Sequence, residues 1–97
     1  MAKFMRLNSK DAVAEEYAFI CPGCNTPHWI RVGGQRPLWQ WNNDINRPTV
    51  SPALLVFPNN QHLRCHSFIT DGEMIFLGDC WHDLKGQTVA IPEWNDA

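Results

Sequence analysis

The chain has 97 residues, which is enough for one domain over residues 1–97 and too few for two. Its formal net charge of −2 and sequence pI of about 6.0 argue against a nucleic-acid binder that depends on phosphate charge alone. No secretory signal and no run of the ~20 apolar residues that cross a bilayer is visible, so we expect a cytoplasmic protein without membrane contact.

Strand signals dominate the chain, and helix signals are weak. The best helix candidate is residues 9–16, where Ser9 could cap a short turn. Runs of β-branched and aromatic residues then predict strands over 16–20, 28–32, 38–41, 49–57, 62–70, 73–81 and 88–91. Pro52 lacks the N–H that a ladder needs, which predicts an edge or bulged strand over 49–57. The sequence predicts a mainly β, antiparallel fold with at most one short helix.

A β-hairpin is predicted in the C-terminal half, because Asp71-Gly72 separates two β-rich runs. With a two-residue turn, Thr70 faces Glu73. Cys65 and Cys80 then lie diagonally on one face of the hairpin, with Cβ atoms within ~8 Å.

The four cysteines predict a metal site. Cys21-Pro22-Gly23-Cys24 is a tight turn that can aim two sulfurs at one point, and in a reducing compartment such thiols favour a metal over disulfides. We expect one structural zinc ion bound by Cys21, Cys24, Cys65 and Cys80, and hence a zinc-ribbon-like domain. A histidine could replace one thiol, and the nearby candidates are His28, His66 and His82.

The hairpin register places His66 on the face opposite the cysteines, together with Asp79. A histidine beside a carboxylate can form an acid–base pair, although a simple oriented hydrogen bond is the commoner role. A polar site of His28, His66, Asp79 and His82 would suit a small metal-dependent hydrolase if the metal kept an open position. Neither a G-x-S-x-G motif nor a P-loop is present.

Aromatic and basic residues alternate in the middle of the chain and suggest a binding surface: Trp29, Arg31, Arg36, Trp39, Trp41 and Arg47. Such residues can stack on bases or dominate a protein–protein contact. The alternative is that the tryptophans fill a small core and the arginines cover it.

Several motifs occur together in the order Cys21-Pro22-Gly23-Cys24 with His28, Pro48–Leu55, Cys65–Phe68 with Asp71-Gly72, Asp79-Cys80 with His82, and Gly86–Val89. This set resembles a family of small phage and prophage proteins over about residues 17–92. Its members are often labelled ammonia monooxygenase, a copper membrane enzyme that nothing in this chain suggests. Ala53 stands where the family often has serine. The resemblance implies a phage or prophage origin and a bacterial cytoplasm, without an established activity.

We therefore expect a non-enzymatic zinc-binding protein that acts by protein–protein contact, with a host protein as its partner. Inhibition of a host defence or regulatory factor would fit a small phage protein by analogy. A nucleic-acid or nucleotide-binding module and a small metal-dependent hydrolase are the alternatives.

Overall fold

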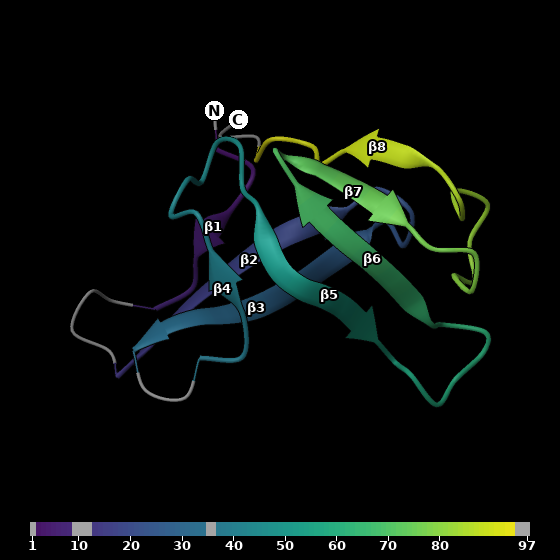
Figure 1. Cartoon of the computed structure of the whole chain (residues 1–97), viewed down its shortest axis with the longest axis horizontal. Helices are drawn as coiled ribbons and strands as arrows, with labels where there is room; N and C mark the ends of the chain where they lie inside the picture. Colours follow the sequence, from purple (N-terminus) through teal and green to yellow (C-terminus); the bar gives the residue numbers. More distant parts are fainter. Residues whose placement is uncertain (1, 9–12, 35–36, 95–97) are drawn as a thin grey trace.

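The computed structural model describes residues 2–8, 13–34 and 37–94, and in these residues the chain forms strands and no helix. The strands are β1 (Met5–Arg6), β2 (Ala14–Cys21), β3 (Thr26–Gly34), β4 (Gln40–Trp41), β5 (Val50–Val56), β6 (Cys65–Thr70), β7 (Glu73–Phe76) and β8 (Thr88–Ala90). They form two antiparallel sheets, ordered β1-β2-β3 and β4-β5-β6-β7-β8 (Figure 1). The predicted mainly β fold is confirmed. Among the described residues, no helix could span a membrane.

The predicted helix over 9–16 is wrong in its second half, because residues 14–16 belong to β2. β2 pairs with β3 along its whole length, from Ala14 opposite Gly34 to Cys21 opposite Thr26. This pairing outweighs the helix propensity of a short Ala-Glu-Glu segment. Residues 9–12, including the proposed cap Ser9, lie outside the described residues.

β5 carries the predicted bulge. Val50 pairs with Ile69 and Leu54 pairs with Ser67, so residues 51–53 of β5 lie opposite the single residue Phe68 of β6. The peptide bond between Ser51 and Pro52 is cis. The bulge therefore lies in the strand that neighbours β6, at the position of Pro52.

The two sheets share one hydrophobic core, and Figure 1 shows the three-stranded sheet behind the five-stranded one. The fully buried side chains from the first sheet and its flanking segment include Phe4, Phe19 and Ile30, and those from the second include Ile69, Met74 and Phe76. Burial alternates along β6 and β7, as expected when one face of a sheet is covered.

The β6–β7 hairpin has the predicted register, with Thr70 opposite Glu73 and Ser67 opposite Phe76. β7 ends at Phe76, earlier than the predicted strand over 73–81. Residues 77–81 instead form an irregular turn that continues past the start of β6. The N–H of Cys80 donates to the carbonyl of Leu77 (3.2 Å), and the N–H of Trp81 donates to that of Arg64 (2.9 Å).

Candidate functional site

A buried cluster of three thiols and one imidazole joins the two sheets. Cys21 ends β2, Cys24 lies in the turn that leads to β3, Cys65 begins β6, and His82 follows β7. One ligand atom from each residue lies within 4.8 Å of all the others, so the cluster could hold a metal ion. Cys21, Cys65 and His82 are buried, while Cys24 is half-buried.

The distances in this cluster suit tetrahedral coordination. The sulfurs of Cys21 and Cys65 are 3.9 Å apart, and the Cys65 sulfur lies 3.6 Å from Nε2 of His82. Bonds of ~2.3 Å to sulfur and ~2.0 Å to nitrogen at a tetrahedral centre imply separations of about 3.8 Å and about 3.5 Å. Three thiols and one imidazole are also among the donor sets that zinc takes in structural sites.

Two N–H groups point at the sulfurs. The backbone N–H of Cys24 donates to the sulfur of Cys21, and the indole N–H of Trp81 donates to the sulfur of Cys24, both at 3.3 Å. The hydrogen bond with Cys65 lowers the pKa of the Cys21 thiol to about 4, while the same contact raises the pKa of Cys65. Burial raises the pKa of Cys24. The N–H groups of Cys24 and Trp81 stabilise negative charge on the sulfurs of Cys21 and Cys24, where a cation would bind.

Two aromatic rings pack against the imidazole of His82. It makes an edge-to-face contact with Phe76, with ring centroids 4.5 Å apart, and another with Trp81 at 5.6 Å. The backbone of Gly23 lies against the same ring, so that a Cβ at position 23 would overlap Cε1 and Nε2 of His82. Within the described part of the chain, Nδ1 of His82 is buried without a hydrogen-bond partner.

The four residues that the structure gathers differ in one member from the expected four cysteines. The Cys80 thiol contacts the backbone of His66, accepting from its N–H (3.3 Å) and donating to its carbonyl (3.1 Å). The expectation for Cys80 assumed that β7 continues to residue 81. Because β7 ends at Phe76, the turn that follows presents His82 to the other thiols. His82 was among the alternative ligands, whereas His28 and His66 are not members of the cluster.

His66 and Asp79 form a pair on the outer face of the second sheet. Nδ1 of His66 lies 3.3 Å from Oδ2 of Asp79, and their side chains are 28% and 43% exposed. The expected juxtaposition of these residues is confirmed. Two backbone contacts of His66 bring the segment that carries Asp79 beside it. The carbonyl of His66 accepts the N–H of Leu77 (2.9 Å), and its N–H donates to the Cys80 thiol. In the described part of the chain, Nε2 of His66 has no hydrogen-bond partner.

The chain offers few hydroxyl groups to this pair. Its serines are Ser9, Ser51 and Ser67. Ser67 follows His66 on β6, so it points to the opposite face of the sheet, where it is fully buried and its hydroxyl finds no partner among the described residues. Ser51 is exposed and belongs to the bulged segment of β5. Its hydroxyl makes no hydrogen bond to the described residues.

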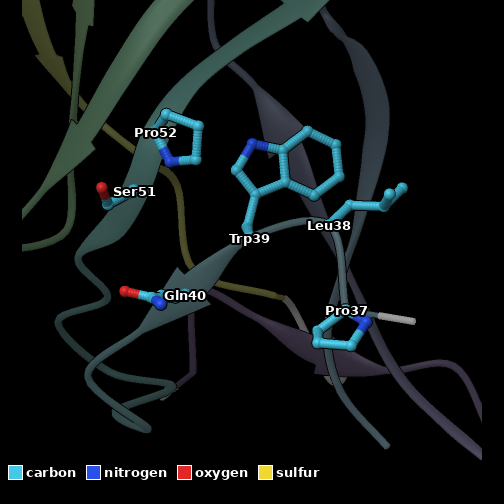
Figure 2. Close-up of a pocket in the computed structure, with 6 residues that line it drawn as sticks. All are labelled: Pro37, Leu38, Trp39, Gln40, Ser51 and Pro52. Atoms are coloured by element: carbon cyan, nitrogen blue, oxygen red, sulfur yellow. The ribbon is translucent and has the colours of Figure 1, made fainter. Parts of the chain in front are cut away.

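Two cavities flank Trp39 along the edge of β5. One, of about 280 Å³, has Ser51 and Pro52 on one side and Pro37, Leu38 and Trp39 on the other (Figure 2). In this view the hydroxyl of Ser51 points away from the indole of Trp39. The other cavity, of about 360 Å³, lies between β3 and the end of β5.

The residues of the expected binding surface do not form one patch. Arg31 pairs with Glu16 (3.3 Å), and Arg47 pairs with Asp71 (2.6 Å). Trp41 packs in the core on Tyr17, with ring centroids 4.7 Å apart. Trp29 and Trp39 line the same 360 Å³ cavity, and Arg36 lies outside the described residues.

Sequence reasoning gave Ser51 no role, because it lies in no nucleophile motif and its nearness to β6 arises only from strand pairing. It also gave Gly23 no role beyond the tight turn between Cys21 and Cys24. The contact between Gly23 and His82 depends on the tertiary fold, and no local signal predicts it.

A family model described as the serine protease of a bacterial ubiquitination-like system, BubE, matches residues 2–77. The match includes Ser51 and His66 and ends just before Asp79. The comparisons found no matching curated protein and no matching solved structure.

The family match corrects several expectations. The resemblance to phage and prophage proteins is wrong as the family assignment, and the expected phage origin and inhibition of a host defence factor lose their support. The expected non-enzymatic binding protein is likewise wrong, as are its nucleic-acid-binding and metal-dependent hydrolase alternatives, because the matched family consists of serine proteases. Over residues 2–77, most of its length, the chain belongs to the BubE family of bacterial ubiquitination-like system serine proteases.

Proposed function

We propose that this protein is a serine hydrolase that cleaves peptide bonds in proteins of a bacterial ubiquitination-like system. The observation that carries the proposal is the pair of His66 and Asp79 on the outer face of β6, in a chain of a serine protease family. Serine proteases need a base that takes the proton of the serine and a carboxylate that orients the base. Nδ1 of His66 faces the carboxylate, so Nε2 would be the base.

Ser51 is the nucleophile that the fold favours. It is exposed, it lies on the strand next to β6, and the bulge around it raises this segment from the regular pleat. Ser67 is unsuitable because it is buried on the other face of the same sheet. A hydrogen bond between nucleophile and base is often loose without substrate, so Ser51 need not contact His66 in this structure.

The reaction then follows from these roles. The Ser51 oxygen attacks the carbonyl carbon while its proton moves to Nε2 of His66, and Asp79 stabilises the imidazolium. The protonated imidazole gives that proton to the leaving amine, and an acyl-enzyme ester remains. A water molecule, activated by the same nitrogen, hydrolyses the ester and restores the serine.

Covalent labelling by a fluorophosphonate probe tests this assignment, because such probes react with activated serines. We expect wild-type protein to be labelled, with the modification mapped to Ser51 by mass spectrometry. Ser51→Ala and His66→Gln should lose labelling, whereas Ser67→Ala should keep it. His62→Gln is the matched control, since His62 is an exposed histidine in the loop before β6 and is not part of the pair. Absence of labelling in wild-type protein would overturn the proposed activity, and labelling at Ser67 would overturn the assignment of Ser51.

We also propose that Cys21, Cys24, Cys65 and His82 bind one zinc ion with a structural role. The donor set, the near-tetrahedral spacing and the N–H groups aimed at the sulfurs support this. Four protein ligands leave no open position, so the ion would connect the sheets and would not bind substrate. Thiolate ligands require reduced cysteines, which supports a cytoplasmic location. Elemental analysis should find one zinc per chain, and its absence from protein purified with zinc present would overturn the proposal.

A further inference from the structure

Beyond Ser51, no described strand pairs with the outer edge of β5. β4 pairs with β5 only at Ser51 and Val50. The preceding residues leave β5 and join β3, because the N–H groups of Leu38 and Trp39 both donate to the carbonyl of Arg31. The rest of β5, up to Val56, therefore has β6 on one side and no described strand on the other.

The free backbone groups of this edge can be assigned. Leu55 lies opposite His66. The N–H and carbonyl of His66 point toward the β7 side, where they meet the Cys80 thiol and the N–H of Leu77. Leu55 and His66 are thus a non-hydrogen-bonded pair, and the N–H and carbonyl of Leu55 point away from β6 to the open edge. The carbonyl of Ala53 points the same way, accepting the indole N–H of Trp39 at 3.5 Å.

An apolar cavity of about 360 Å³ borders the same edge. Its walls include Trp29, Trp39, Leu55 and Phe57. Trp29 is 51% exposed, Leu55 43% and Phe57 57%, so three large apolar side chains meet solvent. They lie beside the N–H and carbonyl of Leu55, which have no strand partner among the described residues. Aromatic and aliphatic walls of this kind suit an apolar side chain.

We propose that this edge is the substrate subsite: an extended peptide pairs with the backbone of Leu55 and places a large apolar side chain in the cavity between Trp29 and Phe57. The inference rests on the proposed function and names the substrate class, an extended chain with an apolar residue near the cleaved bond. Addition of a strand to a free edge is a common way to hold a peptide, with backbone bonds supplying affinity and alternate pockets supplying selectivity.

The order of the strands supports this placement. A bound peptide would lie beside β5, which carries Ser51, and β5 lies beside β6, which carries His66. Asp79 follows on the far side of His66. The nucleophile would then stand between the substrate and the base, the arrangement that attack and proton transfer require.

The test is calorimetric binding of blocked octapeptides to the zinc-loaded protein. The peptides differ only at a central residue, which is leucine, phenylalanine, serine or aspartate. We expect the leucine and phenylalanine peptides to bind about tenfold more tightly than the other two, the effect of burying one apolar side chain. Two further leucine peptides carry an N-methyl group at adjacent positions. Only one of them should lose binding, because successive amides of a strand point to opposite sides.

A change in the protein checks the same contact. Leu55→Pro removes the free N–H without removing a β5–β6 ladder bond, and Leu55→Ala is its matched control, since it keeps the N–H and loses the side chain. We expect Leu55→Pro to weaken binding of the leucine peptide further than Leu55→Ala does. If the proline variant does not fold, the two N-methylated peptides test the same backbone contact on wild-type protein.

Equal binding of all four central residues, no binding at all, or equal loss with both N-methyl peptides would overturn the subsite. Fluorophosphonate labelling separates this failure from that of the proposed function. Labelling without peptide preference would leave the hydrolase and remove the subsite. Preference without labelling would leave a peptide-binding edge and remove the hydrolase.

Discussion

Gly23 and His82 are in direct contact, and this contact explains the glycine of the Cys21–Cys24 turn. The imidazole of His82 occupies the space that a Cβ at position 23 would need. The ring is also held by Phe76 and Trp81, so it has little freedom to move aside. The turn that supplies two thiols therefore also leaves room for His82, which comes from the segment after β7.

Gly23→Ala should weaken zinc binding about 10- to 100-fold, the usual range for a disturbed ligand-supporting contact. Competition with a chelating dye measures this change. Gly78→Ala is the matched control, because a Cβ at position 78 would meet no atom within 4 Å. Equal zinc affinity of the two variants would show that His82 is not a ligand.

The different roles of the cysteines give a second prediction. Cys65→Ser should lose the stoichiometric zinc, since its sulfur lies 3.9 Å from that of Cys21 and 3.6 Å from His82. Cys80→Ser should retain one zinc per chain, because its thiol is not part of the cluster and hydrogen-bonds with the backbone of His66 instead. Elemental analysis of both variants distinguishes a site of three cysteines and one histidine from one of four cysteines. Loss of zinc from Cys80→Ser would contradict the geometry.

Most of the fold could be predicted because its signals are local. The Asp71-Gly72 turn specifies the hairpin and its register, and Pro52 specifies the irregularity of β5. The segment before Tyr17 was misassigned because its helix-forming residues carry no sign of the partner strand β3. The end of β7 was also missed, since residues 77–81 keep an apolar and polar mixture typical of a strand.

The candidate sites were less predictable, because their members meet only through strand pairing. The juxtaposition of His66 and Asp79 followed from the hairpin register, which is local. The replacement of Cys80 by His82 depends on where β7 ends. The role of Ser51 depends on the pairing of β5 with β6 across a bulge, and no motif in the sequence marks it.

Asp79→Asn should slow fluorophosphonate labelling by about 10² to 10⁴, because the amide no longer stabilises the imidazolium or fixes its orientation. The free energy of unfolding should change by less than about 1 kcal/mol, since the pair with His66 is partly exposed. Asp83→Asn is the matched control, an exposed aspartate in the same segment. Equal labelling rates for the two variants would contradict the role of Asp79.

Ser67→Ala should leave the free energy of unfolding unchanged or raise it by up to about 1 kcal/mol. The Ser67 hydroxyl is fully buried and finds no partner among the described residues. Its burial therefore costs hydration free energy that no hydrogen bond offsets, and the alanine variant avoids this cost. Urea denaturation measures the change, with Thr70→Ala as a control at an exposed position of the same strand. A clear loss of stability in Ser67→Ala alone would mean that the hydroxyl has a partner, such as a buried water.

Ala53 offers a test of the direction in which the His66–Asp79 pair points. Ala53 lies two residues from Leu55 on β5, so both side chains share the face on which Leu55 meets His66. A serine at position 53 would therefore be a diagonal neighbour of the base. We expect the double variant Ser51→Ala/Ala53→Ser to regain part of the fluorophosphonate labelling that Ser51→Ala loses, with the probe mapped to position 53.

The matched control for this gain is Ser51→Ala/Leu54→Ser, which places the new hydroxyl on the opposite, buried face and should regain nothing. Labelling at position 53 without labelling at position 54 would locate the activating base on the outer face of β6. Labelling that depends on His66 in the double variant would then identify that base as the same residue that acts on Ser51. If the double variant stays unlabelled while wild-type protein reacts, His66 does not activate a serine at position 53. That result would contradict the assignment of His66 as the base for Ser51.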